Sequence, residues 1–140
     1  MDEHQVRSVI ILGCTGSVGS TALHALEPYG HRFSVAALSA HSDLEGLARI
    51  ARKWNCRNLC VTGEADVSSL AALALPGTTI YRGAEGLLRM LRETEADIVL
   101  NAISGAAGLA PSFAALESGK DLALSNKESV VMAGDVLFSH

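Results

Sequence analysis

Aromatic residues, basic clusters and charge in general are scarce in this sequence. Only 4% of its 140 residues are aromatic and 19% are charged, whereas 49% are hydrophobic. The net charge is −4 at pH 7, and no tract of lysines and arginines offers a footprint for nucleic acid. Small aliphatic residues dominate instead, which suits helices packed closely on a sheet and excludes a disordered chain. We therefore expect one domain of common size.

The three cysteines do not form a disulfide or zinc pattern. Cys56 and Cys60 have no second cysteine pair and no histidine at zinc spacing, and Cys14 lies alone in a glycine-rich segment. A reduced, cytoplasmic protein is the simplest interpretation. The polar start from Met1 to His4 argues against a signal peptide. For Cys14, a small packed thiol is favoured over a redox role.

Uninterrupted hydrophobic runs are also missing. Two uncharged stretches, Ser8 to Leu26 and Ile98 to Leu116, are long enough to span a bilayer as helices. Three glycines interrupt the first stretch, and Asn101, Gly105 and Pro111 interrupt the second. Each stretch therefore predicts a buried strand, a turn and a packed helix rather than a membrane segment.

Short apolar runs alternate with amphipathic stretches along the whole chain. Strands are predicted at residues 6–12, 33–38, 59–62, 79–81, 97–101 and 121–124. Helices are predicted at residues 17–26, 42–54, 68–75, 84–94 and 111–118, and from about residue 126. Ser42 with Glu45 and Ser125 with Glu128 fit capping boxes, and Gly119 fits a helix C-cap. This alternation predicts an α/β fold with a doubly wound, mainly parallel sheet of about six strands, of the Rossmann-like type.

Ligands of such sheets bind at the carboxyl ends of the strands, so the loop between the first strand and the first helix is a candidate site. Gly13 permits a tight turn, Gly16 lets the backbone approach a pyrophosphate, and Gly19 lets the helix pack closely on the sheet. The helix N-terminus adds free N–H groups, and Thr15 and Ser17 add hydroxyl groups. This context predicts dinucleotide binding. A glycine-rich turn without a ligand is the alternative.

The segment after the second predicted strand bears on the type of cofactor. It has no acid at the strand tip, where NAD-binding folds usually place one. His41 and Ser42 are able to hydrogen-bond a phosphate, and two arginines lie on the following predicted helix. Asp43 would oppose a phosphate if it pointed inward, but an acid in the first helical turn is favoured by the helix dipole. These residues favour NADP over NAD.

A polar cluster follows the sixth predicted strand. Lys127, one of only three lysines in the chain, suits an anionic or hydroxylated substrate. Asn126 and Glu128 suit the ribose or amide of a cofactor. A surface lysine followed by a capping glutamate explains the same residues, and the spacing does not decide between the two interpretations.

Three segments, residues 11–19, 101–111 and 119–129, together resemble the 1-deoxy-D-xylulose 5-phosphate reductoisomerase family. The last two are long, nearly gapless matches to the family pattern. The family makes 2-C-methyl-D-erythritol 4-phosphate in the non-mevalonate isoprenoid pathway. It rearranges the carbon skeleton of its sugar phosphate and reduces the resulting aldehyde with NADPH, while a divalent metal (Mg²⁺ or Mn²⁺) holds the substrate. The resemblance implies a homodimer as the full-length enzyme, with no nucleic-acid or membrane partner.

The resemblance also implies roles for individual residues. Lys127 would contact the substrate. The family commonly has a glycine, a basic residue and an asparagine around the adenosine 2′-phosphate, where this chain has His41, Ser42 and Asp43. Contacts there are expected through His41, Ser42 and backbone N–H groups. The full set of expected cofactor-binding residues is Gly13, Thr15, Gly16, Ser17, Val18, Gly19, His41, Ser42, Asp43, Asn126 and Glu128.

The family's chains are much longer, and their metal-binding carboxylates follow the Asn-Lys-Glu segment. We therefore expect residues 1–140 to be the dinucleotide-binding domain, with the metal-binding catalytic and C-terminal domains outside it. We expect no catalytic or metal-binding residue within the chain, and no turnover by the chain alone. Two alternatives remain. Another NAD(P)-dependent dehydrogenase, such as aspartate-semialdehyde dehydrogenase, leaves residues 101–111 and 120–129 unexplained, and a stand-alone nucleotide-sensing module needs no further domain.

Overall fold

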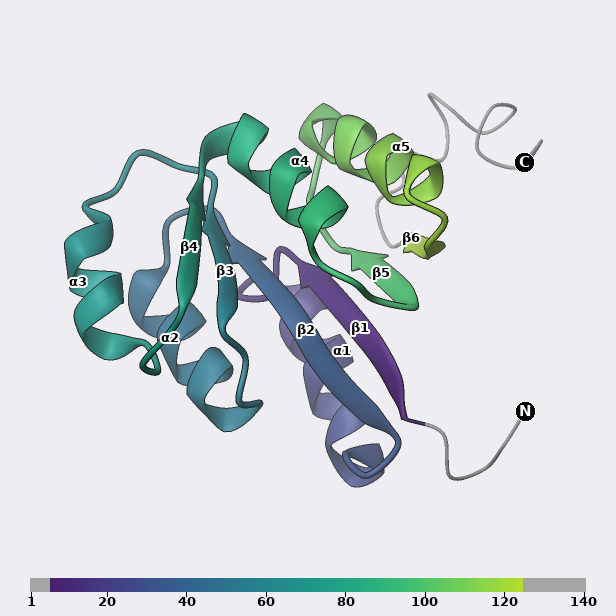
Figure 1. Ribbon diagram of the computed structural model, residues 1–140, viewed down its shortest axis with the longest axis horizontal. Helices are drawn as coiled ribbons and strands as arrows, with labels where there is room; N and C mark the ends of the chain where they lie inside the picture. The colour runs from purple at the N-terminus through teal and green to yellow at the C-terminus, as the bar shows by residue number, and fades with distance from the viewer. Residues whose placement is uncertain (1–5, 125–140) are drawn as a thin grey trace.

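Six parallel strands form a single sheet in the computed structural model, which describes residues 6–124 (Figure 1). The order across the sheet is β4-β3-β2-β1-β5-β6, and every neighbouring pair is parallel. The strands are β1 (Arg7–Leu12), β2 (Phe33–Ala40), β3 (Asn58–Val61), β4 (Thr79–Arg82), β5 (Ile98–Asn101) and β6 (Asp121–Leu124).

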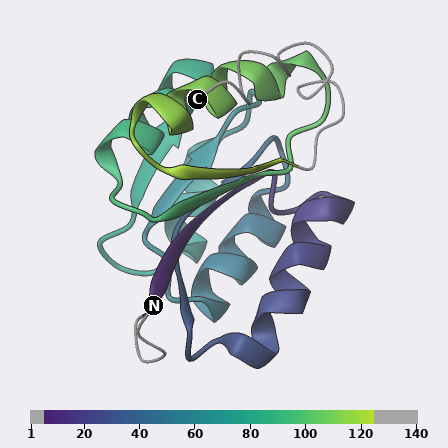
Figure 2. The ribbon, with the colours of Figure 1, turned by 90° about the vertical axis from the view of Figure 1, so that its right-hand side faces the viewer.

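Helices cover both faces of this sheet, as Figure 2 shows. One layer consists of α1 (Ser17–Leu26), α2 (Leu44–Lys53) and α3 (Val67–Leu73), and the other of α4 (Gly83–Glu93) and α5 (Leu109–Glu117). Two single 3₁₀ turns lie at Glu27–Tyr29 and Ala106–Gly108. The predicted doubly wound, Rossmann-like α/β fold is confirmed.

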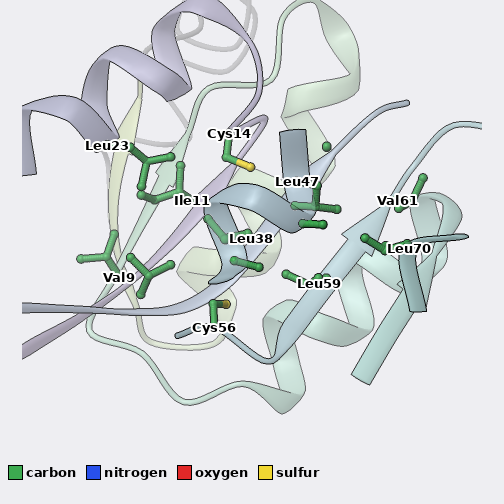
Figure 3. Packing of buried hydrophobic residues seen from close by; sticks show 14 residues of the cluster. Val9, Ile11, Cys14, Leu23, Leu38, Leu47, Cys56, Leu59, Val61 and Leu70 are labelled. Atoms are coloured by element: carbon green, nitrogen blue, oxygen red, sulfur yellow. The ribbon is translucent and has the colours of Figure 1, made fainter. Parts of the chain in front are cut away.

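The two hydrophobic cores follow from the alternation of side chains along each strand. Ile11 of β1 packs on the face that α1, α2 and α3 cover, whereas Ile10 and Leu12 pack on the face that α4 and α5 cover. Both sides of β1 are therefore buried, which is why its sequence is a continuous apolar run. Figure 3 shows the first cluster, in which helix residues meet strand residues. Its labelled members are Val9, Ile11, Cys14, Leu23, Leu38, Leu47, Cys56, Leu59, Val61 and Leu70.

The direction of winding reverses next to β1. From β1 the chain proceeds outward through β2 and β3 to β4, and α4 then returns it to β5 on the other side of β1. Leu12 is paired with Asn101, so β1 and β5 end side by side. The loops that leave them belong to different helical layers. This separation opens a crevice at the carboxyl edge of the sheet, which is where doubly wound folds bind their ligands.

The start of α2 corrects one prediction. The capping box of Ser42 and Glu45 is wrong, because Asp43 is the N-cap and its Oδ1 accepts a hydrogen bond from Gly46 N at 2.9 Å. A Cβ on Gly46 would lie 2.8 Å from the carboxylate carbon of Asp43. The absence of a side chain at Gly46 therefore lets the carboxylate fold over the first turn.

Other element ends agree with the sequence or differ by one or two residues. Gly119 has φ +77° and ends α5 as predicted. Its N–H donates to the carbonyl of Leu116, and the N–H of Lys120 donates to the carbonyl of Ala115. Strand β2 continues two residues beyond the predicted end, to Ala40. The helix predicted from about residue 126, with its capping box, lies outside the described residues. Between residues 6 and 124, no helix is long and apolar enough to cross a membrane.

Candidate functional site

A cleft of about 520 Å³ lies at the carboxyl ends of β1, β2, β3 and β5. Its volume is within the usual range for small-molecule sites. The walls come from the loops after these strands, from the first two turns of α4 and from the first turn of α5. The lining residues are Gly13, Thr15, Gly16, Ser39, Ala40, His41, Thr62, Ala84, Leu87, Leu88, Ala102, Ile103, Ser104, Ala107, Ala110 and Pro111.

The three glycines of the loop after β1 differ in why a side chain is absent at each position. Gly13 has φ +73°, and a Cβ there would lie 3.0 Å from the carbonyl oxygen of Ala102. A Cβ on Gly19 would overlap the carbonyl of Gly13 and lie 2.8 Å from Cys14 Cα. At Gly16, the nearest atom would be 3.5 Å away, which is an ordinary contact. The fold therefore requires glycine at 13 and 19, whereas the open space at Gly16 suits a group that approaches from outside.

The N-terminus of α1 faces the same loop. Gly16 is the N-cap, and within residues 6–124 no side chain caps this end of the helix. The N–H groups of Ser17, Val18 and Gly19 belong to the first turn, which has no intrahelical acceptors. Ser17 and Val18 are exposed, Val18 at 47%. These donors and the positive end of the helix dipole form an environment that favours an anion.

Ser39, at the end of β2, ties the glycine loop to the sheet. Its Oγ accepts a hydrogen bond from Gly13 N at 3.0 Å, and its carbonyl accepts one from Cys14 N at 2.9 Å. On the other side of β1 lies β5, and there Ala102 N donates to the carbonyl of Leu12, just before the loop, at 3.0 Å. The start of the loop is thus held from both adjacent strands.

The loops after β2 and β3 meet at His41 and Thr62. The distance between His41 Nδ1 and Thr62 Oγ1 is 3.1 Å, and Gly63 N donates to the carbonyl of His41 at 2.7 Å. Of the residues expected to surround a 2′-phosphate, His41 lines the cleft, whereas Ser42 and Asp43 do not. The carboxylate of Asp43 is instead turned onto the start of α2.

The arginine side chains of α2 do not line the cleft either. Arg52 donates to the carbonyl of Leu73 at 2.7 Å and so joins α2 to α3. The polar side chains that line the cleft around the end of β2 are therefore those of Ser39, His41 and Thr62.

Asn101 shapes the wall formed by the loop after β5. Its buried side chain donates from Nδ2 to the carbonyl of Gly108 and to Ser112 Oγ, both at 2.8 Å. Its Oδ1 accepts a hydrogen bond from Ile103 N at 3.1 Å. These bonds hold the loop after β5 as a tight turn, with Ala102 and Ser104 on the cleft.

The opposite wall is apolar and was not predicted. Ala84, Leu87 and Leu88 come from α4, which begins directly at the end of β4. Their spacing in the sequence signals only an amphipathic helix, and its approach to the glycine loop results from the crossover to β5. Together with Pro111, this wall suits a flat apolar group next to the polar edge of the cleft.

The thiol of Cys14 is a packing group, as predicted. It is completely buried in the cluster shown in Figure 3, and this burial raises its pKa to about 12. A thiol with such a pKa is protonated at neutral pH and is not a nucleophile.

The remaining predicted residues are Asn126, Lys127 and Glu128, which lie outside the described residues. Strand β6 ends at Leu124, opposite Asn101, at the edge of the sheet that carries the cleft. No group of three or more His, Cys, Asp or Glu side chains gathers within residues 6–124. The described part of the chain therefore does not fit the divalent metal that the resemblance implies.

The fold and the site together define a class of protein. A parallel sheet that winds in both directions from β1, with a glycine loop and a helix N-terminus at the switch point, is a Rossmann-like domain of the dinucleotide-binding class. The family model described as 1-deoxy-D-xylulose 5-phosphate reductoisomerase matches residues 9–134. The chain belongs to this family.

Relatives and solved structures agree with this assignment. The 1-deoxy-D-xylulose 5-phosphate reductoisomerase of Rhodopseudomonas palustris (strain BisB18) is 44% identical over 131 residues, which are 93% of this chain and 32% of that protein. The reductoisomerase of Rhodococcus jostii (strain RHA1) is 41% identical over 98% of this chain and 33% of its own length. The chain thus spans about a third of the length of these relatives.

Two solved reductoisomerases share the fold closely. The enzyme from Zymomonas mobilis, solved in complex with NADPH, superimposes with a TM-score of 0.87 at 33% identity, over 96% of this chain and 36% of that one. A second reductoisomerase, solved with NADPH, fosmidomycin and magnesium, gives a TM-score of 0.85 at 34% identity over 96% of this chain and 33% of that one.

Proposed function

We propose that this chain binds NADPH as the cofactor-binding part of a 1-deoxy-D-xylulose 5-phosphate reductoisomerase. The observation that carries the proposal is the open backbone at Gly16, at the switch point of the sheet and next to the N-terminus of α1. Membership of the family and the NADPH complexes of two solved relatives support the choice of cofactor. The family match also includes residues 101–111 and 120–129, which a semialdehyde dehydrogenase would leave unexplained.

Two parts of the cleft, the glycine loop and the segment after β2, have roles in this proposal. The loop of Gly13, Thr15 and Gly16, with the first N–H groups of α1, would hold the pyrophosphate. His41 would contact the 2′-phosphate. The backbone N–H groups of residues 42 and 43 would assist His41. The carboxylate of Asp43 would not repel the phosphate, because it caps α2. When bound, NADPH supplies the hydride that reduces the substrate's aldehyde.

The whole protein's reaction extends this proposal beyond the chain. The proposed substrate is 1-deoxy-D-xylulose 5-phosphate and the product 2-C-methyl-D-erythritol 4-phosphate, with Lys127 in contact with the sugar phosphate and Asn126 and Glu128 in contact with the cofactor. We place the ligands of the Mg²⁺ or Mn²⁺ ion in the part of the relatives that this chain does not span. A cytoplasmic homodimer is the proposed state of the full-length enzyme.

The test compares two glycine substitutions by calorimetric titration with NADPH. Gly16→Ala adds a methyl group that the fold accommodates but that occupies the side from which a pyrophosphate approaches. We expect its dissociation constant to rise at least about tenfold, equivalent to about 1.4 kcal/mol.

Gly30→Ala is the matched control, because Gly30 precedes β2 at the opposite edge of the sheet and a Cβ there would lie 3.4 Å from its nearest neighbour. Both variants should keep the circular dichroism spectrum of the parent chain. Equal NADPH affinity of Gly16→Ala and the parent would contradict the proposed site.

A further inference from the structure

Ser39 is a buried polar residue at the cleft, and neither the glycine motif nor the family resemblance gives it a role. It is only 1% exposed, lies one residue before the end of β2 and lines the cleft beside Gly13 and His41. Serine is uncommon in fully buried positions, where each polar atom needs a hydrogen-bonding partner. Its hydrogen bonds therefore indicate what the residue does.

A serine hydroxyl has one hydrogen to donate and two lone pairs to accept with. Gly13 N–H donates to Ser39 Oγ at 3.0 Å, which engages one lone pair and directs the hydroxyl hydrogen away from that N–H. Within residues 6–124, no acceptor receives the hydroxyl hydrogen in a hydrogen bond. A buried donor without an acceptor is unfavourable, by about 1 to 3 kcal/mol. Because Ser39 borders the cleft, a bound ligand is the natural acceptor.

The position of Ser39 identifies the part of the ligand. In folds of this class, the tip of the second strand faces the adenosine ribose, and NAD-binding members place a carboxylate there to accept from the 2′-hydroxyl group. Ser39 offers the opposite polarity at that edge, an uncharged donor. None of the described residues lining the cleft has a carboxylate, and that of Asp43 caps α2. Such a donor matches a 2′-phosphate, whose oxygen atoms only accept hydrogen bonds near neutral pH.

We propose that Ser39 determines cofactor preference by two bonds made at once. Its Oγ accepts from Gly13 N–H and holds the glycine loop, while its hydroxyl hydrogen is donated to the 2′-phosphate of NADPH. This inference rests on the proposed function, because it requires that the chain binds the dinucleotide in this cleft. It adds a residue that distinguishes NADPH from NADH to the His41 contact already proposed.

The experiment measures the dissociation constants of NADPH and NADH for the 140-residue chain and its variants by calorimetry. Loss of the hydrogen bond from Gly13 N to Ser39 Oγ should weaken the binding of NADPH and NADH equally. The ratio of the two dissociation constants therefore isolates the contact with the 2′-phosphate. In Ser39→Ala we expect the preference for NADPH to fall about tenfold, as for a hydrogen bond to a charged group. In Ser39→Cys, a nearly isosteric change to a weak donor, the preference should also fall, and this variant serves if Ser39→Ala does not fold. Ser34→Ala, an exposed serine on the same strand, should leave the ratio unchanged.

The outcomes separate the two proposals. If the parent chain binds NADPH and NADH but the ratio is the same in Ser39→Ala and Ser39→Cys, Ser39 only holds the loop and this inference is overturned. If the folded parent chain binds neither cofactor, the proposed function fails and the inference with it. A ratio that falls in both serine variants and not in Ser34→Ala supports the inference.

Discussion

The side chain of Asp43 shows how one residue is able to serve the fold rather than the ligand. The sequence places it among the residues around a 2′-phosphate, where its charge would repel the phosphate. In the structure its carboxylate accepts from Gly46 N at 2.9 Å and is turned away from the cleft. The chain has Ser42 where the family commonly has a basic residue, and the carboxylate of Asp43 does not add a repulsive charge on the cleft.

Removal of this cap should lower stability without improving the binding of NADPH. Asp43→Ala should reduce the free energy of unfolding in urea by about 1 kcal/mol, the usual value of an N-cap side chain. Asp43→Asn should retain the stability, because asparagine caps equally well. Ser42→Ala is the matched comparison and should leave stability unchanged, because Ser42 is not the cap. A gain of NADPH affinity in Asp43→Asn would show that the charge does reach the phosphate.

At the scale of elements, the loop between β5 and α5 depends on a single buried amide. Asn101 is bonded to Ile103, Gly108 and Ser112, so it connects the strand end, the loop and the first turns of α5. Asn101→Ala should lower the free energy of unfolding by about 2 to 4 kcal/mol, because buried partners lose their bonds and a cavity remains.

Ser112→Ala tests whether the effect is specific to the amide. Ser112 is equally buried, and its Oγ donates to the carbonyl of Gly108 at 3.0 Å. The same Oγ accepts from Asn101 Nδ2 at 2.8 Å, so Ser112→Ala removes two hydrogen bonds but leaves the amide bonded to Gly108 and Ile103. We expect the free energy of unfolding to fall by about 1 to 2 kcal/mol, less than for Asn101→Ala. If urea denaturation gave the same small loss for both variants, the amide would not be the organising group of this loop.

The elements differ in how far the sequence predicted them. The strand and the helix on either side of the glycine loop were predicted because their signals are local. A β-branched run is followed by Gly13, which adopts φ +73° in the structure, and then by an apolar stretch that forms α1. The cap of α2 was misplaced by one residue, since Ser42 and Asp43 are both good caps and only the room above Gly46 favours Asp43. Thr62, Leu87 and Leu88 were not predicted as site residues. Their part in the cleft depends on the order of strands and on the path of α4, which no short segment encodes.

For the molecule as a whole, all three cysteines are buried and free. Burial raises the pKa of Cys14 and of Cys60 to about 12 and that of Cys56 to about 11. In the unfolded chain a thiol titrates near pH 8.5. The folded state therefore holds these protons more tightly, so stability is complete below about pH 8.5 and declines as the pH rises toward 11 or 12.

Reaction with Ellman's reagent checks this expectation. At pH 8 the native chain should react with almost none of its thiols, and the chain in guanidinium chloride should react with all three. Urea midpoints at pH 7 and pH 10 should show the lower stability at the higher pH. Rapid labelling of a native thiol at pH 8 would show that at least one of the three is accessible.

The chain as it stands is expected to bind its cofactor without completing the reaction. A divalent ion needs clustered carboxylates, and within residues 6–124 no group of three candidate ligands gathers. The 140-residue chain, NADPH, Mg²⁺ or Mn²⁺ and 1-deoxy-D-xylulose 5-phosphate should therefore show no steady loss of NADPH absorbance. A full-length relative is the positive control. Oxidation by the chain alone, dependent on both sugar and metal, would mean that the catalytic groups have been misplaced.

The central position of β1 also sets the order in which the molecule is completed during synthesis. One edge of β1 pairs with β2 early, but its other edge pairs with β5, where Leu12 meets Asn101. The ribosome must therefore release the chain well past residue 101 before the glycine loop acquires its second neighbour, Ala102. A nascent chain with only the first four strands has the complete glycine motif and an incomplete place to bind nucleotide. The NADPH of the proposed function would therefore stabilise only a chain that has acquired β5, and by mass action its binding would favour the finished domain over partly synthesised forms.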